Sequence, residues 1–298
     1  MLRLGIVDCD TSHVYQFARR LNHTGIAEDQ WVDGARIVAA YPGTSRVESA
    51  ETIAKYVGWL REAGVAIVDQ PKDLLGQVDA VLVESNQGAV HRERATPFLE
   101  TGLPVFVDKP FAGSTADARA MVELAARRGA PLISASSLRF VPAIAAARDD
   151  PALGTLGGAD VYSPGHLNDA NPGLLHYGVH GVEMLYALLG PGCQEVSCTF
   201  HERGEVVTGR WGDGRIGVVR ALRAGAQGYG FTAYGEQGIR SETVPTSHIY
   251  RDLLAAVVPV LAGGPSPVSG AELIEVIAFQ EAALASVQAS GQPIALPV

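Results

Sequence analysis

The chain has 298 residues, with 32 acidic and 23 basic side chains and a formal net charge of -9. Basic residues form no block, so we expect no nucleic-acid partner. Hydrophobic residues make up 47% and charged residues 18% of the chain, which favours extensive burial and argues against disorder. Domains usually hold roughly 100–200 residues, so this length predicts two.

Cysteine usage and apolar patterning indicate where the protein works. Cys9, Cys193 and Cys198 are odd in number and include no CxxC pair, which favours a reducing compartment and predicts a cytoplasmic protein. Residues after Met1 follow a strand pattern and not that of a signal peptide. The most apolar stretch, residues 253–262, contains Pro259 and is too short to span a bilayer, so we expect no membrane association.

The first half of the chain alternates short apolar runs with segments of helical spacing. This alternation predicts parallel βαβ units, and hence an α/β fold with an N-terminal Rossmann-type doubly wound parallel sheet over residues 1–133. The predicted strands are 2–7, 35–40, 65–68, 80–83, 105–107 and 132–133, and the predicted helices are 12–21, 48–62, 91–100 and 115–128.

The pattern changes in the second half, which begins with a Gly- and Pro-rich stretch at residues 151–173. Short β-rich runs separated by turn residues predict a C-terminal α+β domain with a largely antiparallel sheet, residues 134–298, whose closing helices are able to pack back on the first domain. The predicted strands are 196–200, 205–211, 215–222 and 229–234, and the predicted helices are 175–189, 249–261 and 271–289.

The first strand-to-helix turn stands where a dinucleotide fold usually carries GxGxxG, whose glycines let the backbone approach a pyrophosphate. Here Asp8, Asp10 and His13 occupy the three glycine positions. Two carboxylates facing the phosphate position would oppose binding through charge. Thr11, Ser12 and the first helical amides are still able to donate to an anion, so a capped helix with solvated acids and a rearranged phosphate site remain alternatives.

Two further strand ends carry polar residues. After the second strand no acid is present to bind ribose hydroxyls, whereas Ser45 and Arg46 suit a 2′-phosphate; alternatively Arg46 is a solvated surface group.

Asp108-Lys109-Pro110 follows strand 105–107, at the sheet edge where open α/β sheets bind ligands. Lys109 there is either a group that contacts a substrate oxygen or an exposed turn lysine.

Residues Gly173 to Glu183 contain the densest group of titratable side chains. On a continuous helix His176, His180 and Glu183 lie at i, i+4 and i+7 and share a face. Such a group could be an acid/base pair with an orienting carboxylate, or three ligands of a metal such as zinc. The structural alternative is two histidines at a domain interface whose hydrogen bonds are all made within the protein.

These segments in this order resemble the Gfo/Idh/MocA family of oxidoreductases, over nearly the whole chain. Asp108-Lys109-Pro110 resembles the family's EKP segment, and His91 precedes it at the usual distance. Residues 137–142 resemble the entry into the family's second domain, and Gly173 to Glu183 resembles its GxLxDxGxHxxD segment, with His176 on the first aspartate, His180 on the histidine and Glu183 on the last aspartate. Residues 283–286 and 291–294 resemble its closing helix and final strand.

The resemblance implies hydride transfer between the nicotinamide of NAD or NADP and a carbon of a sugar or polyol. It assigns His180 as general base and Lys109 as the group that positions the reacting oxygen. His176 takes the place of an aspartate that, in the family, takes part in proton transfer. The residues expected at the cofactor are Asp10, Thr11, Ser12, His13, Ser45, Arg46, Ser85, Asn86, His91 and Lys109. The family also implies a homo-dimer or homo-tetramer formed through the sheet of the second domain.

Because the glycines are missing, two alternatives accompany the oxidoreductase hypothesis. One is a redox-inactive homologue that acts as a small-ligand-binding or regulatory subunit. The other is a metal-assisted lyase, epimerase or hydrolase that uses His176, His180 and Glu183, with Asp8 or Asp10 as further groups.

Overall fold

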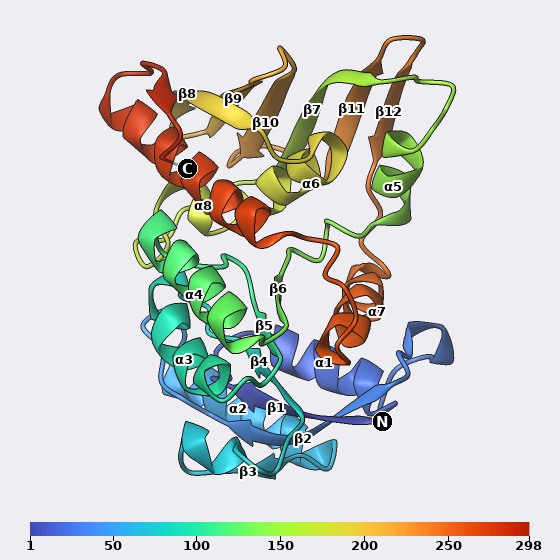
Figure 1. Cartoon of the computed structure of the whole chain (residues 1–298), viewed down its shortest axis with the longest axis vertical. Coiled ribbons are helices and arrows are strands. Elements are labelled where there is room, and N and C mark those ends of the chain that lie inside the picture. The colour runs from blue at the N-terminus through green and yellow to red at the C-terminus, as the bar shows by residue number, and fades with distance from the viewer. Residues whose placement is uncertain (298) are drawn as a thin grey trace. The chain divides into compact units, whose positions relative to one another are not determined.

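The computed structural model describes residues 1–297 and consists of two compact units. The first unit comprises Met1–Ala135 and Tyr250–Gly270, and the second comprises Ser136–Ile249 and Ala271–Val298. The division falls two residues after the boundary expected from the sequence, and the segment Tyr250–Gly270 returns to the first unit (Figure 1). No helix in residues 1–297 has the length and apolar content needed to cross a membrane.

The first unit is built on a six-stranded parallel sheet with the order β3-β2-β1-β4-β5-β6. This is the Rossmann order, and it confirms the predicted doubly wound fold. The strands are β1 (Leu2–Val7), β2 (Ala35–Tyr41), β3 (Ala66–Ile67), β4 (Ala80–Val83), β5 (Val105–Val107) and β6 (Leu132–Ser134). All residues of β4 and β5 are buried, as expected for central parallel strands covered on both faces.

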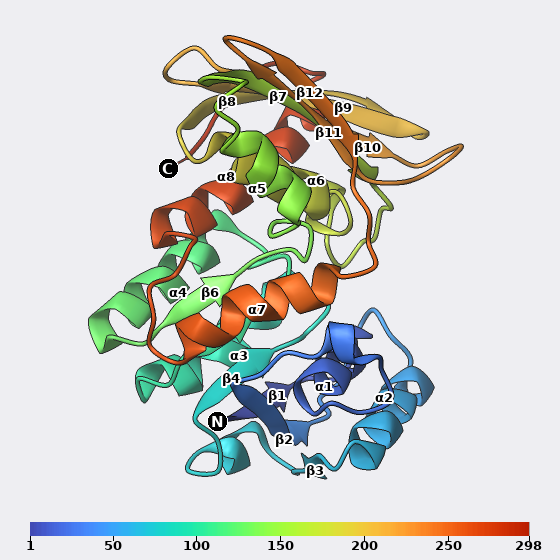
Figure 2. The same ribbon diagram turned by 90° about the vertical axis from the view of Figure 1, so that its right-hand side faces the viewer.

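Four helices connect these strands: α1 (His13–Leu21), α2 (Ala50–Glu62), α3 (Gly88–Glu100) and α4 (Thr115–Arg128). The strand order reverses at β1 and β4, so right-handed crossovers place α1 and α2 on one face and α3 and α4 on the other (Figure 2). Helix α7 (Ile249–Leu261) lies beside α1, because the ring of Tyr250 packs edge-on against the rings of His13 and Phe17.

The second unit is a seven-stranded sheet with the order β12-β11-β7-β10-β9-β8-β13, in which only the β7–β10 pair is parallel. This confirms the predicted largely antiparallel sheet. The strands are β7 (Leu156–Pro164), β8 (Cys193–His201), β9 (Gly204–Trp211), β10 (Ile216–Leu222), β11 (Gly230–Gly235), β12 (Ile239–Thr243) and β13 (Ile294–Ala295). Helices α5 (Pro142–Arg148), α6 (Val179–Leu189) and α8 (Gly270–Gln288) lie on one face of the sheet (Figure 2).

The predictions for this unit were wrong about one helix, and they missed helix α5 and strands β7 and β12. The predicted helix 175–189 is interrupted: a short 3-10 turn, η3 (Gly173–Leu175), precedes α6, which begins only at Val179. Strand β7 lies inside the Gly- and Pro-rich stretch 151–173, where no element was predicted. Gly158 accounts for that error, since a Cβ there would lie 2.5 Å from the carbonyl oxygen of Ile216. The glycine therefore serves close strand pairing and does not mark a turn.

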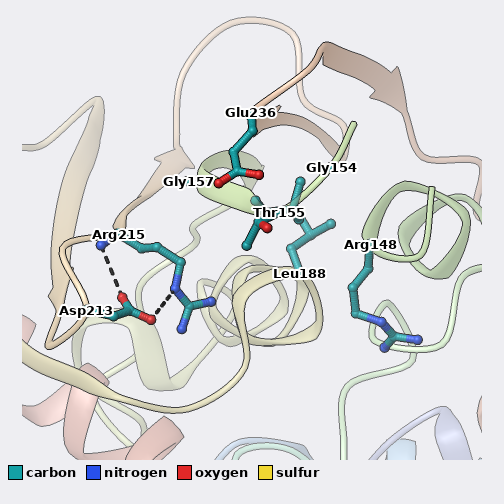
Figure 3. Close-up of a pocket in the computed structure, with 9 residues that line it drawn as sticks. Arg148, Gly154, Thr155, Gly157, Leu188, Asp213, Arg215 and Glu236 are labelled. Carbon is teal, nitrogen blue, oxygen red and sulfur yellow. Dashed lines mark hydrogen bonds and ion pairs between the residues drawn. The ribbon is translucent and has the colours of Figure 1, made fainter. Parts of the chain in front are cut away.

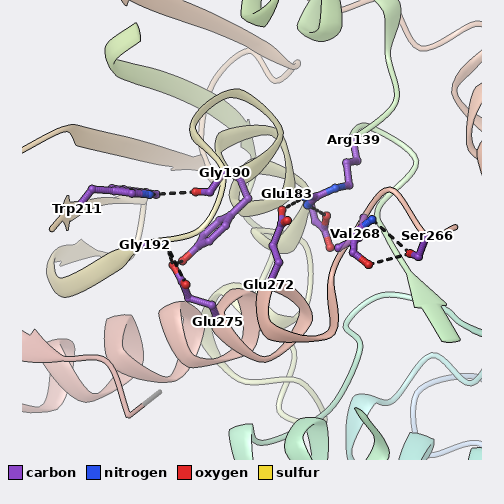
Figure 4. A network of polar contacts seen from close by, with 10 residues as sticks. Arg139, Glu183, Gly190, Gly192, Trp211, Ser266, Val268, Glu272 and Glu275 are labelled. Atoms are coloured by element: carbon purple, nitrogen blue, oxygen red, sulfur yellow. Dashed lines mark hydrogen bonds and ion pairs between the residues drawn. The ribbon is translucent and has the colours of Figure 1, made fainter. Parts of the chain in front are cut away.

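Buried ionic groups connect the helices of the second unit (Figure 4). Arg139 bonds the carboxylate of Glu183 on α6, with 2.6 Å between Nη1 and Oε2, and also pairs with Glu272 on α8. Glu275 on α8 accepts hydrogen bonds from the Tyr186 hydroxyl and from the amides of Gly192 and Cys193. Burial and the adjacent Glu275 raise the pKa of Tyr186 well above its usual value, so this phenol remains a donor.

Replacing Glu275 by Ala is expected to destabilise the protein by about 3 kcal/mol or more, because three donors, two of them buried, lose a charged acceptor. Tyr186→Phe removes only one of these hydrogen bonds and should cost about 1 kcal/mol. Urea unfolding of both variants measures the difference. Equal losses of stability would contradict a network centred on Glu275.

Candidate functional site

Three neighbouring parallel strands of the first unit end in the same row. Val7 of β1 pairs with Val83 of β4, and Val83 pairs with Val107 of β5. The next residue of each strand is therefore an acid: Asp8, Glu84 and Asp108. All three side chains are buried at the carboxyl edge of the sheet, which is where open α/β folds bind ligands.

The turn after β1 keeps the backbone shape that a glycine would supply. Asp8 has a φ of 65°, in the left-handed region, although it carries a side chain. Its Oδ2 accepts hydrogen bonds from the hydroxyl of Ser85 at 2.5 Å and from Nε of Arg94 at 2.9 Å. Gly43 packs directly against this carboxylate, since a Cβ there would lie 1.9 Å from Asp8 Oδ1. The carboxylate at the first glycine position is thus buried and ion-paired.

The carboxylate of Asp10 is also turned into the protein. Its Oδ1 accepts a hydrogen bond from the backbone amide of Asn86 at 2.9 Å, and the side chain is also hydrogen-bonded to Ser45. Burial raises the pKa of Asp10, and these hydrogen bonds oppose that rise. Asp8 and Asp10 are 1% and 2% exposed, so the alternative in which these acids are solvated is wrong.

The third glycine position is occupied by His13, the first residue of α1. Its Nδ1 lies 2.8 Å from Oδ2 of Asp108, and its ring stacks on Phe17. Burial raises the pKa of the Asp108 carboxyl, but the contacts with His13 and Lys109 together outweigh burial and bring this pKa to about 2. Thr11 accepts a hydrogen bond from the His13 amide, whereas Ser12 is exposed and its side chain does not cap α1.

Glu84 is fully buried beside this pair, and neither of its carboxylate oxygens has a hydrogen-bond partner within residues 1–297. Burial raises its pKa well above the usual value, and the negative charge of Asp108 raises it further. Sequence reasoning missed Glu84. Its position after an entirely apolar strand, in the same row as Asp8 and Asp108, was the signal that could have identified it.

The other residues expected at the cofactor have different surroundings. Lys109 follows Asp108 and is 7% exposed, so it is not a solvated turn lysine. His91 is fully buried between the carbonyl oxygens of Ser85 and Phe111, and it therefore fixes two loops of the sheet edge. The hydroxyl of Ser45 accepts hydrogen bonds from the amides of Val47 and Glu48, which fixes the conformation of the loop after β2. Arg46 is exposed, with no ion pair to the described residues.

In the second unit the histidine of α6 is held by a neighbouring hydroxyl. Nδ1 of His180 lies 2.6 Å from the Ser136 hydroxyl, and its ring packs edge-on against Tyr177 and Tyr229. His176 precedes α6, so the expected i, i+4, i+7 face is wrong, although its ring also contacts Tyr177. Sequence reasoning missed both tyrosines.

The proposed metal set of His176, His180 and Glu183 is not assembled in the described part of the chain. Glu183 is committed to its ion pair with Arg139, and among residues 1–297 the one group of such side chains close enough to share an ion is His13, Glu84 and Asp108.

A separate cavity of about 520 Å³ lies in the second unit (Figure 3). There Asp213 and Arg215 pair with each other.

Comparison with known families agrees with this geometry. Residues 14–136 match the Gfo/Idh/MocA family model, described as an oxidoreductase family with an NAD-binding Rossmann fold. Over these residues, which lie in the first unit, the chain is similar to this family. The match covers α1 and strands β2 to β6, and therefore includes Ser85, His91 and Lys109.

Two kinds of relative extend the comparison. A 1,5-anhydro-D-fructose reductase of Ensifer adhaerens is 32% identical over 212 residues, which cover 64% of this chain and 62% of that enzyme. Among solved structures, scyllo-inositol dehydrogenase of Lactobacillus casei with NAD(H) and scyllo-inositol superposes with a TM-score of 0.81 at 15% identity, covering 100% of both chains. GenD2 of gentamicin A biosynthesis, with NAD, gives 0.80 at 19% identity, over 100% of this chain and 97% of that one. At these identities the superpositions establish the fold.

The residues of the first turn fit a dinucleotide in spite of the missing glycines. The left-handed backbone at Asp8 is retained, and α1 starts directly after the turn with its first amides at the sheet edge. The carboxylate of Asp8 is neutralised by Arg94, and that of Asp10 is buried among hydrogen-bond donors. The negative charge that was expected to oppose a pyrophosphate at this turn is therefore largely compensated inside the protein.

The raised pKa of Glu84 predicts a specific pH dependence of stability. Because the folded-state pKa exceeds the unfolded value of 4.5, the folded protein holds the extra proton, and stability falls as the pH rises from there toward the folded-state pKa. The slope from this one group is at most about 1.4 kcal/mol per pH unit. Glu84→Gln removes it.

We therefore expect the difference in unfolding free energy, native chain minus Glu84→Gln, to decrease with rising pH above about 4.5. Urea unfolding at several pH values, in buffer treated with chelator, measures this difference. Parallel pH curves for the two proteins would show that Glu84 keeps an ordinary pKa in the folded state.

Proposed function

We propose that the protein is an NAD(P)-dependent oxidoreductase that transfers a hydride between the nicotinamide and a hydroxyl-bearing or carbonyl carbon of a sugar- or polyol-like substrate. The observation that carries this proposal is Lys109, a buried lysine directly after β5 at the ligand-binding edge of a family Rossmann unit. A binding module without chemistry has no need of a buried ammonium group at this position.

Each catalytic residue has a role that follows from its surroundings. Lys109 donates a hydrogen bond to the reacting oxygen and stabilises negative charge that develops on it. His180 acts as general base, because its Nδ1 is engaged by Ser136 and its ring orientation is thereby fixed for proton transfer at Nε2. His176 is half-buried beside Tyr177, and we assign it to the proton relay. The nicotinamide, when bound, supplies or accepts the hydride.

The sugar-like substrate class is supported by the reductase and the inositol dehydrogenase to which the chain is similar. Aromatic rings around His180 agree with it: the ring of Tyr177 packs edge-on against the rings of His166 and His180, and the ring of Tyr229 packs edge-on against His180. Ring faces of this kind pack well on the C–H faces of sugars. The residues near Tyr177 are therefore proposed as contacts for the substrate.

The cofactor is proposed to bind along the carboxyl edge of the first sheet. Thr11, Ser12 and the amides of α1 are the donors proposed for the pyrophosphate. Ser85, Asn86 and His91 act indirectly, by holding Asp8, Asp10 and the loop after β4 in place. The exposed Arg46 after β2 favours a 2′-phosphate, and hence NADP. Tighter binding of NADH than NADPH would remove Arg46 from this role.

The redox-inactive alternative rests on the replacement of all three glycines. Titration with NADH and NADPH, followed by nicotinamide fluorescence, distinguishes it from the enzyme. Saturable binding of either cofactor supports the oxidoreductase, whereas no binding at millimolar cofactor would favour a ligand-binding or regulatory subunit.

Lys109→Ala is expected to reduce turnover of the best sugar or polyol substrate by about 100-fold or more, because the group that stabilises the reacting oxygen is lost. Lys109 also lies beside the buried Glu84 and Asp108, so circular dichroism must show that the variant is folded before turnover is compared. Lys72→Ala, an exposed lysine of the same unit, is the matched control and should leave turnover unchanged. Undiminished turnover in Lys109→Ala would remove this residue from the mechanism.

We further propose a homo-oligomer, dimer or tetramer, formed through the face of the second sheet opposite its helices. Ile239, Tyr234 and Ile216 are exposed and form a row there, since Tyr234 pairs with Ile239, and both Tyr234 and Ile216 pair with Gly158. An apolar row of this kind is a common interface feature. A solution molar mass of 31.3 kDa, that of one chain, would contradict the proposal.

A reducing compartment, and so the cytoplasm, is proposed as the location, because Cys9, Cys193 and Cys198 are buried free thiols. Detection of a disulfide in the native protein would contradict it.

A further inference from the structure

The carboxyl edge of the first sheet holds a group of side chains that the proposed hydride transfer does not use. One potential ligand atom each from His13, Glu84 and Asp108 lies within 4.8 Å of the others. The three residues come from the start of α1 and from the ends of β4 and β5, and they are 7%, 0% and 1% exposed. They are therefore fixed by secondary structure and withdrawn from water, unlike a cluster of surface acids.

Glu84 is the independent sign that this group is a binding site. Both of its carboxylate oxygens are buried and without hydrogen-bond partners in the described residues, and Oδ1 of Asp108 is in the same condition. An unsatisfied buried acceptor costs about 1–3 kcal/mol, and more when it is charged. Three such oxygens at one place point to an occupant that satisfies them.

The charges around the group define what that occupant is. Glu84 faces Asp108 and Asp10, and Lys109 is the cation that acts on both Glu84 and Asp108. Cys9 is a neutral thiol here, because burial raises its pKa, and Asp8, Asp10 and Glu84 raise it further. Arg94 is already paired with Asp8. The excess negative charge requires a cation or a proton.

We propose that His13, Glu84 and Asp108 form a binding site for one divalent transition-metal ion, of the Zn²⁺ or Mn²⁺ class, within the first unit. One imidazole nitrogen with two carboxylates suits these ions, whereas Ca²⁺ prefers six to eight oxygen ligands. In a tetrahedral site, ligands at about 2.1 Å from one ion lie about 3.4 Å apart, so separations of up to 4.8 Å in this group contract by up to about 1.4 Å on binding. The proposal goes beyond hydride transfer and does not depend on it.

Such an ion would have a structural effect. It would join the first turn of α1 to the ends of β4 and β5, in the turn that has no glycine motif. The bond between His13 and Asp108 would be replaced by two bonds to the ion, and Glu84 would lose its proton on binding. Metal affinity should therefore rise with pH, and bound metal should stabilise the fold.

The test uses the full chain after chelator treatment, dialysed against Zn²⁺ or Mn²⁺, with Ca²⁺ as the comparison ion. We expect one Zn²⁺ or Mn²⁺ per chain by elemental analysis, a raised melting temperature, and weaker binding at pH 5 than at pH 7.5. Glu84→Gln and Asp108→Asn should each lower the affinity by about 100-fold. Glu123→Gln, an exposed acid of α4, should change nothing.

Circular dichroism shows whether each variant is folded, and His13→Gln provides a further reading if a carboxylate variant fails to fold. Absence of Zn²⁺ and Mn²⁺ binding, or binding of equal strength in Glu84→Gln, would overturn the proposal. A proton held between Glu84 and Asp108 would then be the occupant. Because none of these readouts involves turnover or a dinucleotide, a negative result here leaves the proposed oxidoreductase function unaffected.

Discussion

The contact between His13 and Asp108 is the interaction on which the first unit's functional edge depends. It joins the first residue of α1 to the residue that follows β5, at 2.8 Å and out of reach of water. Because Lys109 is next to Asp108 in the chain, this contact also fixes where the lysine leaves the sheet. A hydrogen bond in a low-dielectric environment is strong only when both partners are held, and here each is anchored by a regular element.

The same edge shows how a glycine-dependent turn tolerates acids. Asp8 adopts the left-handed backbone that glycine would provide, at a cost of order 1 kcal/mol. Its carboxylate is offset by Arg94 and Ser85, and Gly43 leaves the space for it. The turn after β1 thus has no glycine of its own, but it needs Gly43 in the loop after β2 to leave room for the Asp8 side chain. Charge at the turn is compensated inside the protein and is not presented to a ligand.

In the second unit, ionic pairing separates residues that the sequence grouped together. Glu183 pairs with Arg139 and so contributes to the packing of α6, whereas His180, three residues earlier, bonds Ser136 and faces aromatic rings. The interruption before Val179 takes His176 off the helix. One motif therefore supplies both a structural carboxylate and a candidate catalytic imidazole, and the metal-ligand interpretation of this motif loses its geometric basis.

Strand alternation along the first 133 residues determined the Rossmann fold, because fully buried parallel strands must be continuous apolar runs such as residues 80–83 and 105–107. The segment Asp108-Lys109-Pro110 and the His176–Glu183 motif were likewise sufficient to indicate the resemblance to the family and to place Lys109 at a strand end. These features depend on local periodicity and spacing. The sequence contains both directly.

Only the tertiary structure decided where the charges point. Asp8 and Asp10 turn inward because Arg94, Ser85 and the Asn86 amide, some 76 to 86 residues away, supply their partners. Glu84 becomes a candidate ligand because sheet register aligns β1, β4 and β5, and no local pattern encodes that register. Strand β7 was missed for the same reason: Gly158 allows close approach to a strand that lies 58 residues later in the chain.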